Sequence, residues 1–187
     1  MTFSAPIVER TMHGTDATFA SWAEQFIVDG NRAEVLMVSR GATGNVWLQR
    51  KQVWRLPSGT INPGEDPIAC VERETDEEFG RRLEVVRNLA IMKLKTDAPG
   101  VTGSFTSYIF LLDCGRHIPR AKDLSEGISG WRAVPISTLY AEAQVLRKMQ
   151  PDQSEHGWRL PYWGTFRAIE HELVAELLHA QGDVNER

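Results

Sequence analysis

The chain has 187 residues, the length of about one domain, and its 42% hydrophobic content is enough for a sizeable core. The net charge of −4 argues against a general nucleic-acid-binding protein, although a nucleotide substrate stays open because a metal ion can neutralise phosphate locally. No window reaches the ~20 apolar residues of a membrane span, and Met1 to Arg10 lacks the features of a signal peptide. We therefore expect a cytoplasmic protein without membrane association, in which Cys70 and Cys114 are reduced thiols.

Hydrophobic periodicity and turn residues predict an alternation of strands and helices along the whole chain. In chain order the predicted elements are an irregular arm (1–14), a helix (16–29), two strands (33–40 and 46–54), a helix (67–79), two strands (82–95 and 103–114), a polar loop (115–128), a short strand (131–134), a helix (135–149), a loop (150–160) and a final helix (164–180). This order is typical of a mixed sheet between helical layers.

Two of the predicted helices carry clear end signals. Asp16 can cap the first helix, with Gly30-Asn31 as its stop, and the aromatic residues inside it fall at helical spacing, which indicates core packing. For the helix at 67–79, Asp66 is suited to the N-cap, Pro67 to the first helical position and Gly80 to the end.

The segment Arg73-Glu-Thr-Asp-Glu-Glu78 concentrates negative charge on one helix edge. Glu74, Glu77 and Glu78 stand at i, i+3 and i+4, so they repel one another unless a cation lies among them. A hard divalent ion with oxygen ligands is a suitable counter-charge, which favours Mg²⁺ beside a phosphate substrate. Arg73 can pair with one glutamate and fix its conformation, and the Gly59 carbonyl can add a further oxygen ligand.

This pattern resembles the signature box of the Nudix hydrolases, G-x5-E-x7-R-E-U-x-E-E-x-G-U, in which U is a bulky apolar residue. All seven fixed positions are filled, by Gly59, Glu65, Arg73, Glu74, Glu77, Glu78 and Gly80. Thr75 and Arg81 stand where the family prefers apolar residues, and we expect Thr75 to weaken packing beneath the helix. The box covers only residues 59–81, but the order of the flanking elements is also similar to that of the family.

The resemblance implies a Nudix-type α/β/α sandwich with a mixed β-sheet between helices. We expect residues 1–187 to form a single Nudix domain with an N-terminal helical extension and C-terminal helices. It also implies an Mg²⁺- or Mn²⁺-dependent pyrophosphohydrolase that cleaves a diphosphate linkage in a nucleoside triphosphate, nucleotide sugar or ADP-ribose type of substrate. Its metal ligands would be Gly59, Glu74, Glu77 and Glu78.

Family members take the base that activates water either from the box or from a later loop. Glu126 occupies such a loop, although it can equally be an ordinary surface charge. The catalytic candidates are therefore Glu77, Glu78, Arg73 and Glu126, and weaker candidates for the base are Asp97, Asp123 and Glu155.

Basic and aromatic residues just before the box are candidates for substrate binding. Arg50, Lys51 and Arg55 can contact phosphates, and Trp54 or Trp131 can stack on a base. The segment Tyr162 to Arg167 is expected to pack in the core, with a cleft-closing role or a homodimer face as alternatives.

Two other functions remain to be weighed. A non-catalytic Nudix-like module that binds a nucleotide and regulates a partner commonly loses box glutamates, whereas this chain keeps them all. Isopentenyl diphosphate isomerisation needs a placed cysteine, and Cys70 lies within the predicted metal-binding helix rather than opposite it.

Overall fold

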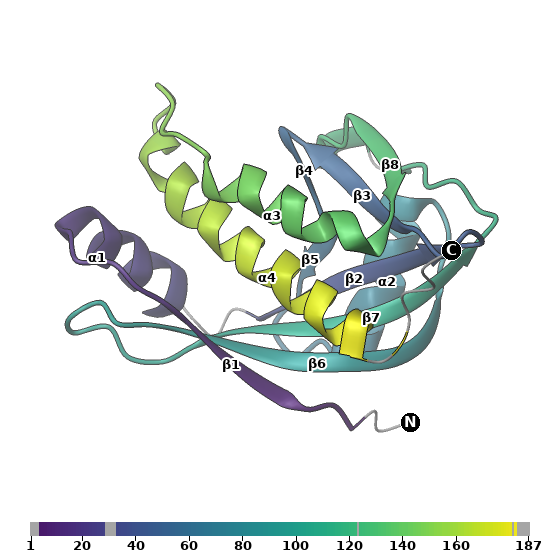
Figure 1. Cartoon of the computed structure of the whole chain (residues 1–187), viewed down its shortest axis with the longest axis horizontal. Helices are drawn as coiled ribbons and strands as arrows, with labels where there is room; N and C mark the ends of the chain where they lie inside the picture. The colour runs from purple at the N-terminus through teal and green to yellow at the C-terminus, as the bar shows by residue number, and fades with distance from the viewer. Residues whose placement is uncertain (1–3, 29–32, 123, 181, 183–187) are drawn as a thin grey trace.

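A computed structural model describes residues 4–28, 33–122, 124–180 and 182 (Figure 1). The strands are β1 (Ile7–Met12), β2 (Ala33–Gly41), β3 (Val46–Lys51), β4 (Val53–Arg55), β5 (Ser58–Thr60), β6 (Glu84–Thr96), β7 (Phe105–Gly115) and β8 (Gly130–Val134). The helices are α1 (Ala17–Ala23), α2 (Pro67–Phe79), α3 (Leu139–Arg147) and α4 (Leu160–Ala180), with shorter helical turns η1 (Glu24–Val28), η2 (Leu124–Glu126), η3 (Ile136–Thr138) and η4 (Gly157–Arg159).

The strands form one mixed sheet in the order β1-β6-β7-β2-β3-β4, with β5 paired to β2 and β8 paired to β3. Two pairs, β1 with β6 and β2 with β7, are parallel, and the other pairs are antiparallel. Such a sheet needs cover on both faces if its central strands are apolar throughout.

Strand β2 shows how both faces are covered. Val35 and Met37 pack with residues of α2, whereas Leu36 and Val38 belong to the opposite hydrophobic cluster, which includes α1 and α4. This alternation follows from the two-residue period of a strand. Figure 1 shows α3 and α4 on the near side of the sheet and α2 behind it. The predicted α/β/α sandwich is therefore confirmed.

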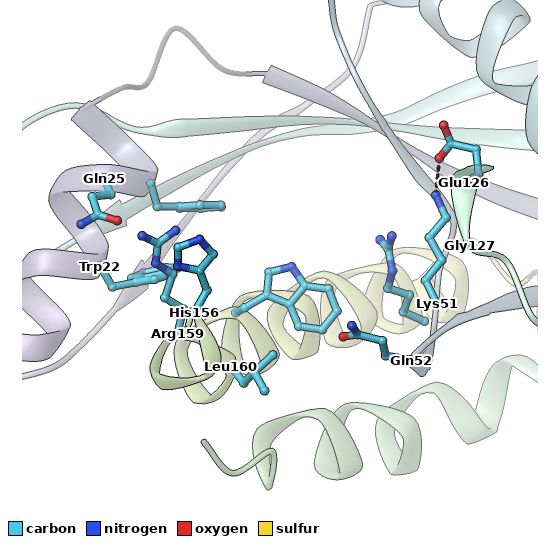
Figure 2. A pocket seen from close by; sticks show the side chains of 12 residues that line it. Trp22, Gln25, Lys51, Gln52, Glu126, Gly127, His156, Arg159 and Leu160 are labelled. Carbon is cyan, nitrogen blue, oxygen red and sulfur yellow. Dashed lines mark hydrogen bonds and ion pairs between the residues drawn. The ribbon is translucent and has the colours of Figure 1, made fainter. Parts of the chain in front are cut away.

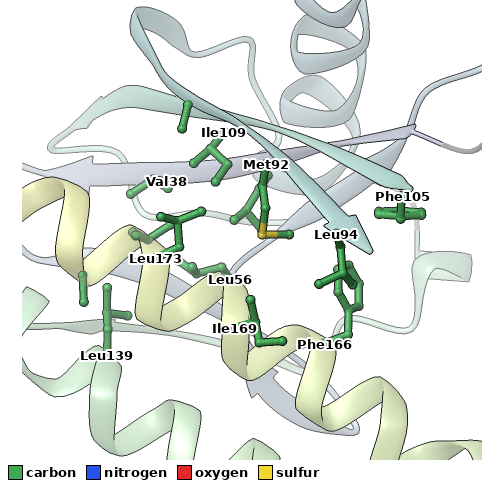
Figure 3. Packing of buried hydrophobic residues seen from close by; sticks show 14 of the residues in the cluster. Val38, Leu56, Met92, Leu94, Phe105, Ile109, Leu139, Phe166, Ile169 and Leu173 are labelled. Atoms are coloured by element: carbon green, nitrogen blue, oxygen red, sulfur yellow. The ribbon is translucent and has the colours of Figure 1, made fainter. Parts of the chain in front are cut away.

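Helix α4 supplies much of the apolar layer on its side of the sheet. Figure 3 shows Phe166, Ile169 and Leu173 of this helix facing Met92 and Ile109 of the central strands. Because α4 has buried residues on most of its circumference, packed against α3 on one side and the sheet on the other, it acts as an internal support.

Helix α2 begins and ends where its residues predict. The Asp66 carboxylate accepts a hydrogen bond from the Ile68 amide (2.8 Å), Pro67 follows, and Gly80 ends the helix in the left-handed region with φ 80°. Thr75 does not leave a defect, because its hydroxyl donates to the Val71 carbonyl and accepts from the Leu83 amide.

The N-terminal arm was predicted to be irregular, and this was wrong. Residues Ile7–Met12 form β1, which extends the sheet by parallel pairing with β6. Only Met12 of this strand is fully buried, so its sequence carries little of the apolar alternation that marks a strand. Backbone hydrogen bonds hold the edge, such as that from the Ile91 amide to the Pro6 carbonyl (2.9 Å).

Two other predicted boundaries were also wrong. The single strand predicted over 46–54 is a hairpin that reverses at Gln52, a residue with φ 69° and without the usual turn signature. The last helix starts at Leu160 rather than Gly164, and the predicted stop of the first helix at Gly30-Asn31 lies outside the described residues. Among the described residues, no helix is long and apolar enough to cross a membrane.

Candidate active site

Arg73 is the centre of a partly buried charge network on one edge of α2. Its guanidinium makes a bidentate contact with Glu65 (2.9 and 3.0 Å) and also donates to Glu74 (2.7 Å), Glu77 (3.2 Å) and the Thr60 carbonyl (3.1 Å). One planar cation thus fixes three carboxylates relative to strand β5. The predicted pairing of Arg73 with box glutamates is present in this geometry.

The Glu74 side chain occupies space that is free because residue 59, on β5, is a glycine. A Cβ atom at Gly59 would lie 2.0 Å from the Glu74 carboxyl carbon, far inside any tolerated contact. Burial raises the pKa of Glu74 to about 7, and the Glu77 and Glu78 carboxylates add to the rise while Arg73 opposes it. The glycine at the start of the box therefore makes room for a carboxylate that lies close to two others.

Lys51, at the end of β3, joins α2 to the loop that follows β7. Its ammonium lies 2.7 Å from a Glu78 oxygen and 2.7 Å from a Glu126 oxygen. The Glu78 side chain is fully buried, and burial raises its pKa although Lys51 acts in the opposite direction. The second Glu78 oxygen, Oε2, is buried without a hydrogen-bond partner.

Two adjoining cavities meet at Lys51, Arg55 and Glu126. A polar cavity of about 360 Å³, which we call the carboxylate cavity, is lined by Glu34, Lys51, Arg55, Ser58, Gly59, Thr60, Asn62, Arg73, Glu74, Glu77, Glu126 and Arg167. A larger cavity of about 550 Å³, which we call the aromatic cavity, is lined by Trp22, Gln25, Phe26, Lys51, Gln52, Arg55, Glu126, Gly127, His156, Arg159, Leu160 and Trp163 (Figure 2).

In this structure, Arg73 and Lys51 supply the positive charge that offsets the glutamates on this edge of α2. Within the described part of the chain, no three Asp, Glu, His or Cys side chains converge closely enough to hold a metal ion. Arg73 separates Glu74 from Glu77, and Lys51 occupies one oxygen of Glu78. The repulsion that led us to expect a dication is thus already offset by two protein cations.

The structure divides the predicted substrate-binding residues into two pairs. Lys51 and Arg55 line both cavities, and Arg55 is buried with a hydrogen bond to Ser58 (2.9 Å). Arg50 and Trp54 line neither cavity, because successive strand residues face opposite sides of the sheet. The Trp54 ring packs instead beneath the guanidinium of Arg132, at 4.6 Å.

The other aromatic and acidic candidates that the structure describes line neither cavity. Trp131 packs against Phe79 with ring centroids 4.6 Å apart. Asp97 pairs with His13 (2.6 Å), and Glu155 is exposed. Asp123 lies outside the described residues.

A buried ionic cluster beneath the carboxylate cavity was not predicted. Arg167 of α4 donates to Glu34 of β2 (2.8 and 3.0 Å) and to Glu170 (2.7 Å). Burial acts to raise the pKa of Glu34, but Arg167, the hydrogen bond with Glu170 and the charge of Arg55 together outweigh it and hold that pKa below its ordinary value. Burial and the nearby Glu34 charge instead raise the pKa of Glu170 well above its ordinary value.

The charges of this cluster balance when Glu170 is protonated. Ser107 Oγ lies 3.1 Å from Glu34 and 2.9 Å from Glu170, so it can donate to the Glu34 carboxylate and accept from the Glu170 hydroxyl. Arg167 and Glu34 both line the carboxylate cavity. Because they stand 133 residues apart in the sequence, no local spacing could have indicated their pairing.

Both cysteines are free and buried, as expected for reduced thiols. Burial raises the pKa of Cys70 to about 12 and that of Cys114 to about 11, so both remain protonated at neutral pH. Neither thiol lines the two cavities.

The chain is similar in sequence to known proteins over its middle part. The NUDIX domain family model matches residues 26–156. Nudix hydrolase 7 of Arabidopsis thaliana is 36% identical over 89 residues, which cover 44% of this chain and 30% of that protein. The RNA pyrophosphohydrolase of Pectobacterium atrosepticum is 43% identical over 65 residues, which cover 33% of this chain and 37% of that protein. The matched segments thus span about a third of the length of these relatives.

Solved structures also resemble this chain. A crystal structure of DR0079 from Deinococcus radiodurans aligns with 60% of this chain and 71% of its own, at 22% identity and a TM-score of 0.47. The E. coli dihydroneopterin triphosphate pyrophosphohydrolase aligns with 74% of this chain and 95% of its own, at 16% identity and a TM-score of 0.45. Because the family model covers more than half of the sequence and includes the entire box, the chain belongs to the Nudix hydrolase family.

Proposed function

We propose that this protein is a metal-dependent pyrophosphohydrolase that cleaves a phosphoanhydride bond in a nucleoside diphosphate derivative. The observation that carries the proposal is the carboxylate cavity, in which Glu74 and Glu77 of the box share one polar space with Lys51 and Arg55. Acidic groups that can hold a cation and basic groups that can hold phosphate oxygens therefore line the same site. Nucleoside triphosphates, nucleotide sugars and ADP-ribose types all satisfy this description.

Glu74, Glu77 and Glu78 would hold Mg²⁺ or Mn²⁺, with the Gly59 carbonyl as a further ligand, if these side chains moved closer together than they stand beside Arg73 and Lys51. The donor set consists of oxygen atoms, as these ions prefer, and Glu78 Oε2 is buried without a partner. The missing side chain at Gly59 leaves the space that Glu74 uses. When bound, the metal supplies Lewis acidity to a phosphoryl oxygen and lowers the pKa of a water molecule.

The protein's own side chains would position the substrate and move the proton. Lys51 and Arg55 line the junction of the two cavities, where they can offset the charge that spreads over the phosphoryl oxygens. Glu126 lies at the same junction, within reach of Lys51, and is the candidate to accept a proton from water. Arg73 would act by holding Glu74 and Glu77 in place.

Replacing Glu77 with Gln tests the proposal, with Glu72→Gln as the matched control. Both residues lie on α2 and are partly exposed, but only Glu77 lines the carboxylate cavity. We expect Glu77→Gln to lower turnover at least about a hundredfold on a panel of nucleotides with Mg²⁺, while Glu72→Gln stays near the wild-type rate. Phosphate release and chromatography of the products measure both variants, and circular dichroism shows whether they fold.

Near-normal turnover in Glu77→Gln would contradict the assignment of the box. Tight nucleotide binding without hydrolysis by the wild-type protein would favour the alternative, a non-catalytic regulatory module. The cytoplasmic location, a homodimer and a single domain over residues 1–187 stay predictions of the sequence.

A further inference from the structure

The aromatic cavity is built in part from segments outside the family match. The NUDIX model covers residues 26–156, whereas five lining residues lie before or after it. These are Trp22, Gln25, Arg159, Leu160 and Trp163. The α1 region and the start of α4 therefore add to the common fold a compartment of about 550 Å³, within the range of about 300–1,000 Å³ typical of small-molecule pockets.

The two ends of this cavity differ in chemistry (Figure 2). At one end Lys51 and Glu126 form the junction with the carboxylate cavity, and Glu126 is the only carboxylate among the described lining residues. At the other end Trp22, Gln25, His156 and Arg159 gather. A ligand whose phosphates lie at Lys51 would thus place its remaining group among aromatic side chains, beside hydrogen-bond donors.

The aromatic wall at this far end is preorganised. Trp22 and Phe26 are stacked, with ring centroids 4.8 Å apart, and Phe26 packs edge-on against Phe166 of α4 at 4.9 Å. Trp22 is almost fully buried by these contacts. Because Phe19 and Phe105 cover the outer faces of this stack, the rings form a rigid end of the cavity that a base would meet at their edges, with little further side-chain freedom lost.

Arg159 is held in position but has hydrogen-bonding capacity left. Its guanidinium lies 5.1 Å from the Trp158 ring centroid, and its amide donates to the His156 carbonyl (3.0 Å). Its Nε atom is buried without a hydrogen-bond partner, and no carboxylate of the described residues forms an ion pair with it. Among the cations that line the cavity, Lys51 is by contrast engaged by two glutamates.

We propose that the aromatic cavity binds the base of the substrate and that Arg159 selects a 6-oxopurine, so that guanine- or hypoxanthine-containing nucleoside diphosphate derivatives are preferred over adenine ones. The proposal rests on the function proposed above, because it takes the phosphates to lie at Lys51. A 6-oxopurine presents O6 and N7 as adjacent acceptors, which match the paired donors of a guanidinium. Adenine presents a donor at the 6-position, so one of the two hydrogen bonds is lost.

Binding of non-hydrolysable probes tests the selection without requiring turnover. We would titrate the full chain with the α,β-methylene analogues of GDP, IDP and ADP in the presence of Mg²⁺, using calorimetry. A bidentate arginine contact discriminates by about 1–3 kcal/mol, which corresponds to about 5- to 150-fold tighter binding of the GDP and IDP analogues. The IDP analogue shows that the 6-oxo group, and not the 2-amino group of guanine, is recognised.

Two matched variants assign the preference to a residue. Arg159→Met should bring the affinity for the GDP analogue down to that for the ADP analogue, with the ADP affinity within about twofold of wild type. Arg116→Met, which changes an exposed arginine that lines neither cavity, should keep the full preference. Thermal unfolding of each variant confirms that the fold is kept.

The outcomes separate this inference from the proposed function. Equal affinities in the wild-type protein, no binding of any probe, or a preference that survives Arg159→Met would each overturn the role of Arg159. If hydrolysis of nucleotides nevertheless depends on Glu77, the proposed function stands alone. If the probes bind with the expected preference but no nucleotide is cleaved, the base selection stands and the hydrolase assignment fails.

Discussion

The ammonium group of Lys51 forms ion pairs with two carboxylates that come from separate parts of the chain. Glu78 comes from the box helix and Glu126 from a loop, yet both lie 2.7 Å from the same nitrogen. The Glu78 side chain is buried, so its negative charge needs this partner. A metal ion that binds Glu78 would compete with Lys51, and a displaced Lys51 would be free to contact a phosphate.

Glu126→Gln is expected to lower kcat by roughly 10²- to 10⁴-fold if this side chain accepts the proton from water. The amide keeps the size of the side chain and can still lie near Lys51, so the effect reports the lost base rather than a lost contact. Initial rates at saturating substrate, compared with those of the wild-type protein, measure this loss.

Glu155→Gln serves as the comparison for Glu126, since Glu155 is exposed and lines neither cavity. Its rate and its pH profile should match those of the wild-type protein. An unchanged kcat in Glu126→Gln would move the role of the base to a glutamate of the box.

The site residues that the sequence could identify are those with fixed local spacing. The box glutamates, Arg73 and Gly59 fall into this class, because a helix and its preceding strand place them relative to one another. Arg159 could not be found in this way, since its neighbours in the cavity come from α1 and β3. For Arg50 the two-residue period of the strand would have sufficed, because it places Arg50 and Lys51 on opposite faces.

At the scale of helices and strands, the elements predicted best are those whose ends are marked by capping or turn residues. Helix α2 was predicted to the residue because Asp66, Pro67 and Gly80 each have a conformational reason to be there. Strand β1 was missed because parallel pairing with β6 stabilises it, and that partner lies more than 80 positions further along the chain. Its one buried side chain, Met12, is too weak a signal.

Helix α4 is connected to the segment that leads into the box through a buried histidine. The Leu56 amide donates to His171 Nε2 (3.1 Å), so the ring is neutral and its Nδ1–H donates to the Arg167 carbonyl (2.8 Å). Burial lowers the pKa of His171 to about 4, and the charge of Arg167 contributes. A proton on Nε2 would break the contact with Leu56.

The free energy of unfolding should therefore fall as the pH is lowered from about 6.5 to about 4. The unfolded chain takes up a proton at His171 near pH 6.5, whereas the folded chain resists it until about pH 4, so acid favours the unfolded state. The shift corresponds to about 3 kcal/mol at most. Urea unfolding at several pH values should show this slope in the wild-type protein and less of it in His171→Gln.

His179→Gln on the same helix is the control, because His179 is exposed. It should leave the pH dependence of stability unchanged. A slope in His171→Gln equal to that of the wild type would mean that the acid sensitivity comes from other groups, such as the carboxylates of the buried cluster.

At the scale of the whole molecule, the segments before and after the family match are part of one core. Phe19 and Trp22 of α1 belong to the same hydrophobic cluster as Leu36 of β2 and Leu173 of α4. The α1 helix also contacts α4 directly, since Phe19 and Tyr162 lie 5.7 Å apart between ring centroids. A change inside this shared core can therefore test the prediction of a single domain over residues 1–187.

Phe19→Ala should therefore destabilise the entire protein and not only release its N-terminal helix. Phe19 is 1% exposed, and removal of a buried phenylalanine typically costs about 3–5 kcal/mol. We expect the urea midpoint to fall equally when unfolding is followed by circular dichroism and by amide exchange in the central strands β2 and β7. Thr18→Ala, one position earlier and exposed, should change stability by less than about 0.5 kcal/mol.

If the N-terminal helix were an appendage, Phe19→Ala would detach it in an early transition while β2 and β7 kept their wild-type protection. The single-domain prediction would then be wrong, and so would the idea that α1 is a fixed wall of the aromatic cavity. If Phe19→Ala instead lowers the urea midpoint equally in both measurements, the α1 segment that carries Trp22 is as stable as the sheet. A preformed base compartment requires this, because a wall that opened easily would weaken ligand binding by the fraction of time it spent open.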